Sequence, residues 1–493
     1  MQITVAKKTR GFENSVTGLE VVQNGTFFND SVVAQIGYQA GRELENRNRR
    51  KKFGLKEKDP MPALERNCIA DCRDSYLSNN SDWVNVETVI STSPDQIAIA
   101  PGSLVREWTD NGRRYFQYKL DHYSVNFYSF LSARYQVDRR EWNGVKIEVY
   151  YLKEQPWNVP KMWRSVEKSF EYYTRNFGPY PHKEARIIEF PRIAHFAQAF
   201  PGTMPYSEAI GFIANLKNPD DIDMVYYVVA HEMGHQWWAH QVIGANMQGA
   251  TLLSETLAQY SALMVMEKEY GRDLMRKFLK YEMDEYLRSR GRELLKDRPL
   301  LKVEANQGYI HYRKGSVVMY YLREMIGEEV VNRALRKVLK QYGYQQPPYP
   351  TSYALVDALR EETPPQLQYL IQDLFYDITL FSNRTLQATA RKRADGKYDV
   401  TLEAEARKFK ADDQGNEKEV PVSDWIELGA FAKPPKGKKY GKTLYRERVL
   451  MKSGIGTYTF TVNEVPDKAG IDPFALLIDR IPDDNVKTVD LGS

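Results

Sequence analysis

The 493-residue sequence contains only two cysteines and no long apolar run. A membrane-spanning helix needs about 20 consecutive apolar residues, and no segment reaches that length. The first ten residues, MQITVAKKTR, also lack the apolar centre of a secretory signal peptide. We therefore expect the chain as given to be soluble. Its cellular location stays open, because the soluble domain of a bacterial membrane protein would have the same features.

The sequence also has little net charge. Its 69 Lys and Arg nearly balance its 65 Asp and Glu, which leaves +4 at pH 7. So small a net charge creates only a weak electrostatic field around the protein, which gives little support to nucleic-acid binding. We therefore expect no nucleic acid as a partner. The most basic stretch, residues 47–58, lies among polar residues and includes Glu57, and we interpret it as a solvated loop.

The two cysteines, Cys68 and Cys72, are four residues apart in a segment, residues 62–77, that we expect to be helical. Thiols at this spacing lie on neighbouring turns of a helix. Helical geometry suits a disulfide poorly, and two thiols alone do not form a structural zinc site. We therefore predict buried free thiols, which leaves the redox compartment open.

Hydrophobic periodicity divides the chain into three parts, about the number expected at roughly 150 residues per domain. Alternating runs such as VKIEVYYL predict strands in the first part, whereas steps of three and four residues predict helices in the second. Alternation returns in the last part and favours a β-sandwich. We predict an α+β multidomain protein with an N-terminal β-rich domain at 1–153, a mostly helical domain at 154–380 and a C-terminal β-sandwich domain at 381–493. The helices expected in the middle part cover residues 221–240, 254–270, 272–288, 314–326 and 328–342.

The motif with the clearest chemical content is HEMGH at residues 231–235, on a predicted helix. His231 and His235 are about 40° apart around the helix axis and one turn apart along it, so both imidazoles can reach one metal ion. Glu232 is about 100° from His231, which suits contact with a metal-bound water rather than ligation. In a chain of this composition the pattern would occur about 0.01 times by chance. We interpret it as a site for one zinc ion, with Glu232 as the general base.

A catalytic zinc needs a third protein ligand and an open position for water. A His six residues after His235 would serve, but Gln241 stands there, and His240 lies well around the helix from the site. Glu255 is the better choice, because it lies close to the start of the next predicted helix. Ser254 is a candidate cap for that helix.

These motifs resemble the M1 family of zinc aminopeptidases, in which HExxH is followed by eighteen residues and then a Glu. Here nineteen residues separate HEMGH from Glu255, and one inserted loop residue explains the offset. The sequence LSETLAQY stands where the family has a Leu-Asn-Glu-Gly-Phe-Ala type of sequence. The resemblance implies that residues 154–380 form a thermolysin-like catalytic domain with zinc as its cofactor and peptides as its substrates.

A second feature of the family is a Tyr just before a Lys-Gly pair, which donates a hydrogen bond to the developing oxyanion. Tyr312, followed by Arg313, Lys314 and Gly315, fits this pattern. A phenol suits the task because it is neutral near pH 7 and is a single directed donor. The resemblance thus implies that Tyr312 is a catalytic residue beside Glu232.

The third feature, a Gly-x-Met-Glu-Asn loop whose Glu holds the free amino terminus of the substrate, is altered in this chain. Gly202 and Met204 are in place, but Pro205 and Tyr206 stand where Glu and Asn are expected. Glu208 follows soon after, and we predict that it supplies the amine-binding carboxylate on a longer loop. The alternative is an exposed loop acid without a role in binding.

The phrases STSPDQIAIAPG and HEMGHQWWAHQVIGANMQGATLLSETLAQYSA look especially like peptidase regions fused to bacterial ABC-transporter permeases. The resemblance implies membrane-spanning permease segments, outside this sequence, as a partner. The expected function is that of a zinc metallopeptidase that removes N-terminal residues from peptides. Two alternatives stay open, namely a zinc endopeptidase and a non-catalytic binding module. The module is disfavoured because a structural zinc site needs neither Glu232 nor Tyr312.

Overall fold

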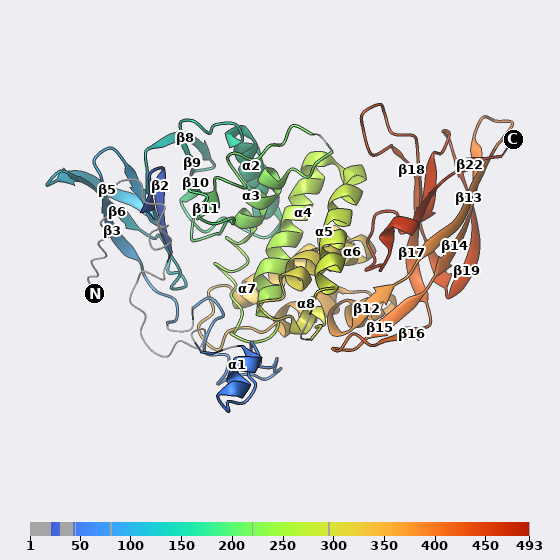
Figure 1. Cartoon of the computed structure of the whole chain (residues 1–493), viewed down its shortest axis with the longest axis horizontal. Helices are drawn as coiled ribbons and strands as arrows, with labels where there is room; N and C mark the ends of the chain where they lie inside the picture. The colour runs from blue at the N-terminus through green and yellow to red at the C-terminus, as the bar shows by residue number, and fades with distance from the viewer. Residues whose placement is uncertain are drawn as a thin grey trace.

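The computed structural model describes residues 21–29, 43–44, 46–78, 81–218, 220–293 and 296–492. Figure 1 shows β structure at the N-terminal end of the molecule, helices in the middle and β structure again at the C-terminal end. This arrangement confirms the expected α+β multidomain class, while the exact domain boundaries stay predictions. The first ten residues, on which the interpretation of the N-terminus rests, lie outside the described residues.

The N-terminal part contains two small antiparallel sheets, with strand orders β1-β2-β7-β4 and β3-β6-β5. A short helix, α1, lies between β2 and β3 in sequence, so the predicted loop is wrong at residues 47–52. Asn46 caps this helix, because its side chain accepts a hydrogen bond from the backbone N–H of Arg49 at 3.0 Å. The elements are β1 (Val21–Val22), β2 (Gly25–Asn29), α1 (Arg47–Lys52), β3 (Glu87–Thr92), β4 (Ile97–Ile99), β5 (Ser103–Asp110), β6 (Arg113–Lys119) and β7 (Ser129–Ala133).

The next sheet supports the candidate site and has the order β11-β10-β9-β8. Strands β9, β10 and β11 are parallel, and β8 is antiparallel to β9. Helix α2 connects β9 to β10, which gives the crossover that parallel strands require. The elements are β8 (Tyr135–Trp142), β9 (Val145–Leu152), α2 (Val159–Asn176), β10 (Glu184–Phe190) and β11 (Thr203–Ser207).

Helices fill the middle of the chain, as the apolar steps of three and four residues predict. They are α3 (Met224–Gly234), a π-helical turn η3 (Leu252–Thr256), α4 (Leu257–Tyr270), α5 (Met275–Arg290), a second π-helical turn η6 (Tyr309–Lys314), α6 (Gly315–Ile326), α7 (Glu328–Tyr342), α8 (Tyr353–Glu362) and α9 (Gln368–Ile371). Among the helices within the described residues, none combines the length and apolarity needed to cross a bilayer.

One predicted helix ends early. Residues 221–240 were expected to be helical, but α3 stops at Gly234 and His235 is its C-cap. The chain then turns so that Trp237 and Trp238, 1% and 0% exposed, both enter the core. Ala239, with a φ of 130°, lies outside the helical region, so the helix cannot continue to residue 240 as expected.

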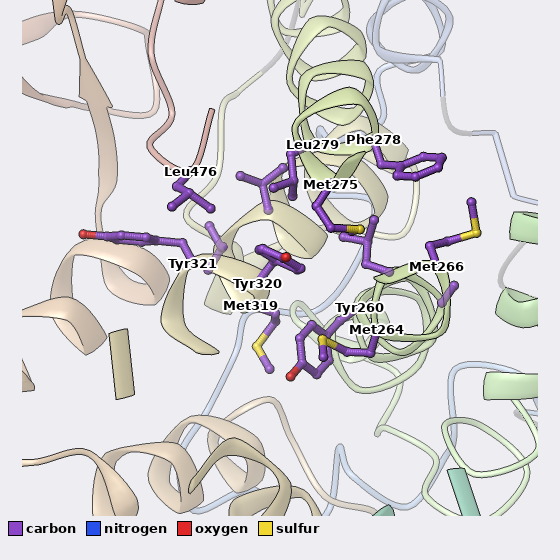
Figure 2. Packing of buried hydrophobic residues seen from close by; sticks show 14 of the residues in the cluster. Tyr260, Met264, Met266, Met275, Phe278, Leu279, Met319, Tyr320, Tyr321 and Leu476 are labelled. Carbon is purple, nitrogen blue, oxygen red and sulfur yellow. The ribbon is translucent and has the colours of Figure 1, made fainter. Parts of the chain in front are cut away.

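The core between the helices is rich in methionine and aromatic side chains (Figure 2). Met264 and Met266 of α4 pack with Met275 of α5 and with Met319 and Tyr320 of α6. Unbranched methionine side chains adapt to irregular gaps between helices. Leu476, from the C-terminal part, belongs to the same cluster, so the helical and C-terminal parts share one core.

The C-terminal part is built mostly from antiparallel strands, with β22 parallel to β13, as its alternating pattern predicts for β structure. Two four-stranded sheets have the orders β19-β14-β13-β22 and β18-β17-β20-β21, and a small sheet has the order β12-β15-β16. The elements are β12 (Ile378–Phe381), β13 (Arg384–Lys392), β14 (Tyr398–Ala406), β15 (Lys408–Ala411), β16 (Glu417–Val420), β17 (Ser423–Phe431), β18 (Thr443–Lys452), β19 (Gly454–Val462), β20 (Lys468–Ile471), β21 (Val486–Thr488) and β22 (Asp490–Leu491).

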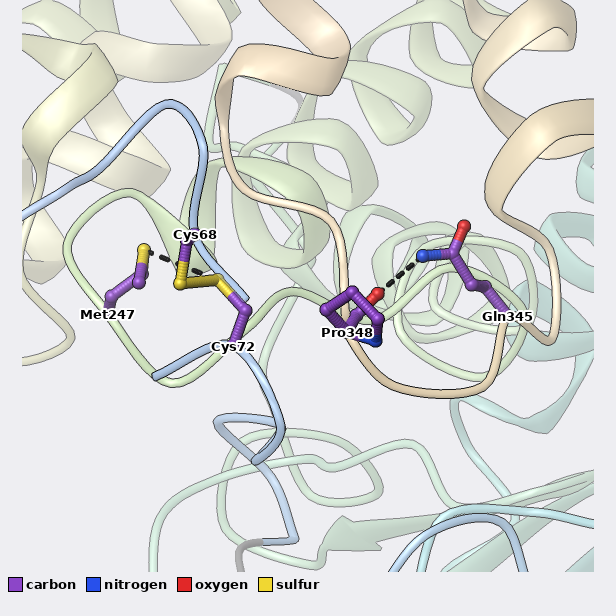
Figure 3. The surroundings of a disulfide bond; sticks show 5 residues. All are labelled: Cys68, Cys72, Met247, Gln345 and Pro348. Atoms are coloured by element: carbon purple, nitrogen blue, oxygen red, sulfur yellow. Dashed lines mark hydrogen bonds between the residues drawn. A yellow bond between two sulfur atoms is a disulfide. The ribbon is translucent and has the colours of Figure 1, made fainter. Parts of the chain in front are cut away.

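Residues 62–77 are not helical, and Cys68 and Cys72 form a disulfide (Figure 3), with their Cα atoms 5.7 Å apart. The predicted helix and the predicted free thiols are therefore wrong. The segment makes its backbone hydrogen bonds with distant parts of the chain, such as that from Tyr349 N–H to the Cys72 carbonyl at 2.7 Å. Local spacing could not reveal these long-range contacts, which replace helical ones.

Candidate metal centre

The C-terminal half of α3 carries three of the predicted site residues into the core. Asp223 caps the start of this helix, since its carboxylate accepts from the backbone N–H of Tyr226 at 3.1 Å. Most residues of α3 are buried, including His231 and Glu232 near its end. A helix enclosed in this way holds polar side chains in fixed positions, but they need partners to offset the loss of water.

His231, His235 and Glu255 form one cluster, in which the candidate ligand atoms lie within 4.8 Å of one another. The Nε2 atoms of the two histidines are 3.0 Å apart. The Oε2 atom of Glu255 is 3.4 Å from the Nε2 atom of His231 and 3.2 Å from that of His235. The structure thus brings together the three residues that the sequence predicts as ligands.

The orientation of the His235 ring follows from a backbone contact. Its Nδ1 atom is 2.9 Å from the carbonyl oxygen of Trp238, which can only accept a hydrogen bond. Nδ1 therefore carries the proton in the neutral ring, and the lone pair of Nε2 faces the cluster. This is the arrangement that a metal-ligating histidine needs, with the second ring nitrogen donating to a carbonyl group.

The electrostatics of the cluster favour a cation. Burial by itself would raise the pKa of Glu255, but the neighbouring His235 and His231 hold it well below its usual value. Burial likewise opposes a charge on His235, yet the Glu255 carboxylate raises the pKa of His235 to about 9. Two nitrogen donors and one carboxylate oxygen that converge on a point fit a divalent zinc ion, and this donor set leaves a fourth position for water.

Glu232 lies beside this cluster without belonging to it. Its side chain is 6% exposed, and burial raises its pKa to about 8. The nearby backbone N–H of Ala199 opposes this rise, because it favours the charged form of the carboxylate. Within the part of the chain that the structure describes, its Oε2 atom has no hydrogen-bond partner. A buried carboxylate with one free oxygen beside a ligand set is suited to accept a proton.

Tyr312 reaches the cluster from η6. Its ring centroid is 5.7 Å from that of His231. Burial, followed by the charge of Glu255, raises the pKa of Tyr312 well above its usual value, so the phenol keeps its proton. Gly315 makes this approach possible, because a Cβ atom there would lie 2.6 Å from Oγ1 of Thr256, the residue after Glu255. The hydroxyl of Thr256 also donates to the carbonyl of His311 at 2.6 Å.

The histidine that sequence reasoning set aside stays outside the cluster. The Nε2 atom of His240 is 3.0 Å from the carbonyl oxygen of Ala199, and burial lowers the pKa of His240 to about 3. Ser254 does not cap the helix as expected, because Thr251 occupies the N-cap position and Ser254 lies inside η3. Its hydroxyl instead receives a hydrogen bond from Tyr76 at 2.5 Å.

Part of this chain is similar to a known peptidase domain. Residues 163–374 match the model of the peptidase family M1 domain. The chain contains an M1 peptidase domain.

Several aminopeptidases resemble part of this M1 domain. Human endoplasmic reticulum aminopeptidase 2 is 23% identical over 218 residues, which cover 41% of this chain and 22% of the human protein. Aminopeptidase M1 of Arabidopsis thaliana is 26% identical over 215 residues, covering 41% of this chain and 24% of the plant protein. The alignments thus span about a quarter of these relatives.

Among solved structures, a mutant of an M1 zinc metallopeptidase from Deinococcus radiodurans is similar to this chain. The sequence identity is 17%, the match covers 60% of this chain and 66% of that one, and the TM-score is 0.46.

Gly202 and Met204, predicted to bind substrate, are both buried in the M1 domain, Gly202 just before β11 and Met204 within it. The backbone of β11 is hydrogen-bonded on both edges. One edge pairs with β10, and the other pairs with residues 196–200, here named the edge segment. Bonds from Gln198 N–H to the Pro205 carbonyl and from Ser207 N–H to the Phe196 carbonyl hold the edge segment in place. A strand paired on both edges has no backbone groups left for a ligand. This pairing therefore argues against the predicted role of Gly202 and Met204 in substrate binding, which stays a prediction.

Glu208 follows β11 and is 5% exposed rather than an exposed loop acid. Its Oε1 atom accepts from the backbone N–H of Arg192 at 3.0 Å. Its Oε2 atom accepts from the amides of Asn24 and Gln155 at 3.0 and 3.1 Å. The three donors are uncharged, and their hydrogen bonds give the carboxylate a role in joining β1–β2 and the β9–α2 link to the sheet.

Sequence reasoning missed two features next to the site. The edge segment reads FAQAF and has no motif of its own, although it lies beside Glu232. Tyr76 comes from a part of the chain 178 residues before its partner Ser254. A long-range contact of this kind leaves no periodic signal in the sequence.

Proposed function

We propose that this chain is a zinc-dependent metallopeptidase that hydrolyses peptide bonds and acts as an M1-like aminopeptidase. The observation that carries the proposal is the convergence of His231, His235 and Glu255, with Glu232 and Tyr312 beside them. The three ligands would hold one zinc ion. A structural zinc site would need neither the buried carboxylate nor the phenol, which argues against a non-catalytic binding module.

The chemistry follows from these side chains. Zinc, when bound, acts as a Lewis acid toward the attacking water and the scissile carbonyl. The free oxygen of Glu232 accepts the proton of the water and then delivers it to the leaving amine. The Tyr312 phenol donates a hydrogen bond to the carbonyl oxygen as negative charge develops there. Burial of these groups strengthens each interaction by keeping bulk water out.

The edge segment supports a peptide as substrate. Its residues 196, 198 and 200 bond to β11, so the backbone groups of Ala197 and Ala199 point to the opposite side. The carbonyl of Ala199 is 3.0 Å from Nε2 of His240, and its N–H lies near the Glu232 carboxylate. Among the described residues, neither the N–H nor the carbonyl of Ala197 has a backbone partner. An extended peptide can add to such an edge through main-chain hydrogen bonds, which would bring its scissile bond next to Glu232.

Recognition of the free amino terminus is the step that separates an aminopeptidase from an endopeptidase. We propose Glu208 as the amine-binding carboxylate, because only uncharged groups compensate its charge. One observation argues against amine binding by Glu208. Both of its carboxylate oxygens already accept hydrogen bonds, from Asn24, Gln155 and the backbone N–H of Arg192. An endopeptidase is therefore the second candidate function.

Matched peptides test the proposal. One peptide has a free amino terminus and its partner is acetylated, and mass spectrometry follows their cleavage by the zinc-loaded protein. An aminopeptidase removes residues stepwise from the free peptide alone, and Glu208→Gln then slows this removal. Cleavage of both peptides at internal bonds would make the protein an endopeptidase. If neither peptide were cleaved, the binding-module alternative would gain support.

The membrane-spanning permease segments expected from the resemblance are part of the proposal too. They would place the M1 domain in a transporter assembly, with this chain as its soluble region. Affinity purification of the full-length protein from membranes, followed by mass spectrometry, tests this. Permease peptides in the same polypeptide or complex are expected, and recovery in the soluble fraction alone would contradict it.

A further inference from the structure

The segment at residues 62–78, here named the disulfide loop, lies against the chain that joins the histidine ligands to Glu255. Its carbonyl groups at Pro62 and Asp74 accept from the backbone N–H groups of Gln248 and Asn246 at 2.9 and 2.8 Å. Tyr76 N–H donates to the carbonyl of Gly244 at 3.1 Å. The loop is thus hydrogen-bonded to residues 244–248, between the end of α3 and the start of η3.

One side chain of the disulfide loop reaches the metal centre. The hydroxyl of Tyr76 donates to Oγ of Ser254 at 2.5 Å, and Ser254 is 0% exposed and directly precedes Glu255. Burial and then the charge of Glu255 raise the pKa of Tyr76, so its phenol remains a donor. Tyr76 also contributes to the raised pKa of Tyr312. Both phenols therefore lie within electrostatic reach of the same carboxylate.

Glu255 depends on such contacts for its orientation. It lies in the π-helical turn η3, whose N-cap residue Thr251 makes no side-chain capping bond. The widened turn is held from outside, by Tyr76 through Ser254 and by His311 through Thr256. A ligand is kept in place by the groups that its own residue and its neighbours contact, and loss of these groups weakens metal binding.

We propose that Tyr76 is a positioning residue that keeps Glu255 turned toward the two histidines, and that the Cys68–Cys72 disulfide holds Tyr76 in position. The inference rests on the proposed function, because it takes Glu255 as a zinc ligand. Cys72 is fully buried against Met247, with sulfur atoms 3.9 Å apart, in the same stretch that the loop contacts (Figure 3). The disulfide thereby cross-links Cys68 and Cys72 next to residues 244–248, the stretch to which the disulfide loop is hydrogen-bonded.

Zinc affinity, measured by competition with a chromophoric chelator, tests the role of Tyr76. Loss of a group that hydrogen-bonds directly to a metal ligand typically lowers metal affinity about 10- to 100-fold. Tyr76 contacts the residue next to a ligand rather than the ligand itself, so we expect Tyr76→Phe to raise the Kd for zinc by only about 3- to 10-fold. The ring remains, so the melting temperature should hardly change. Tyr118→Phe is the matched control, because Tyr118 is a buried tyrosine whose hydroxyl donates to the Ala98 carbonyl at 2.9 Å, away from the site.

A double-mutant cycle separates positioning from general loss of structure. Ser254→Ala removes the acceptor and should raise the Kd by a similar factor, with no further increase when it is combined with Tyr76→Phe. An unchanged Kd in Tyr76→Phe, additive effects in the double variant or an equal loss in Tyr118→Phe would overturn the role of Tyr76.

The disulfide is tested with Cys68→Ala/Cys72→Ala, since thiol reductants would themselves bind zinc. This variant should raise the Kd as Tyr76→Phe does, and should have no added effect in the Tyr76→Phe background. A Kd equal to that of the wild type would overturn the role of the disulfide. Wild-type protein that binds no zinc would contradict the proposed function and this inference together, whereas tight binding that is indifferent to Tyr76 contradicts only the inference.

Discussion

The guanidinium of Arg313 contacts the fully buried carboxylate of Glu282 at 3.0 Å. Glu282 also accepts hydrogen bonds from the hydroxyl of Tyr227 at 2.8 Å and from the amide of Gln259 at 3.1 Å. These four residues come from η6, α5, α3 and α4, and Arg313 directly follows Tyr312. The network therefore fixes η6, and with it the Tyr312 phenol, relative to the helices that carry the candidate ligands.

Removal of Arg313 should destabilise the protein. Arg313→Ala leaves the Glu282 carboxylate buried without its cation, which should cost about 3 kcal/mol of unfolding free energy. Lys337→Ala is the control, because Lys337 makes an ion pair with Glu362 at the surface, where solvent screens the two charges and their separation should hardly change stability. Denaturant unfolding measures both changes. Equal effects of the two substitutions would show that the buried network does not stabilise η6.

Tyr312→Phe should lower kcat by about 10²- to 10³-fold with little change in KM, because the phenol acts on the oxyanion rather than on the bound peptide. Zinc content should stay at the wild-type level. Tyr309→Phe is a neighbouring control, since its hydroxyl donates to Glu293 at 2.9 Å and not to the site. Steady-state hydrolysis of a chromogenic peptide measures the effect. A rise in KM alone would place Tyr312 in substrate binding instead.

The ligand assignment makes a prediction about two nearby histidines. His235→Ala should abolish stoichiometric zinc binding, since it removes one of three donors. His240→Gln should keep one zinc per chain, because His240 contacts the carbonyl of Ala199 outside the cluster. Elemental analysis after dialysis gives both numbers. Zinc loss in His240→Gln with retention in His235→Ala would refute the ligand set.

Stability should fall in mild acid because of His182. Burial lowers the pKa of His182 to about 3, and neither ring nitrogen has a hydrogen-bond partner among the described residues. The unfolded state takes up a proton near pH 6.5 while the native state does not, so unfolding binds protons between these values and stability decreases as the pH falls. The loss should be about 2 kcal/mol between pH 7 and pH 5.

Denaturant unfolding of wild type and His182→Gln at both pH values checks this. The variant should lose less stability on acidification, by about the same 2 kcal/mol. Identical pH dependence in the two proteins would mean that His182 has the same pKa in the native and unfolded states, so that burial does not lower it.

The part of the site that depends on local spacing can be predicted from the sequence alone. The interval between His231 and His235 places both on one side of a helix, and the residues around Glu255 and Tyr312 form motifs that are recognisable without the fold. Strands and helices follow from their periodicity for the same reason. Each of these signals is a short pattern in which neighbours in sequence are also neighbours in space.

The remaining features depend on contacts between distant segments. Cys68 and Cys72 have a spacing that a helix would share, and only the pairing of their loop with residues 244–248 makes it irregular. The early end of α3 is followed by a turn in which Ala239 has a φ of 130°, and spacing alone does not reveal this turn. The edge segment pairs with its neighbour β11, but its position beside Glu232 depends on the distant helix α3, and Tyr76 is positioned by the distant Ser254. None of these relationships is encoded in a local pattern.

Zinc titration of the metal-free protein tests the central claim most directly. Wild type and Glu232→Gln are stripped with a chelator, and peptide hydrolysis is followed as zinc is added. We predict that both proteins bind one zinc ion, that hydrolysis by the wild type rises to a plateau at one equivalent, and that Glu232→Gln stays at least about 10²-fold slower throughout. Equal hydrolysis by the two proteins, or activity in the wild type that does not depend on zinc, would contradict the account.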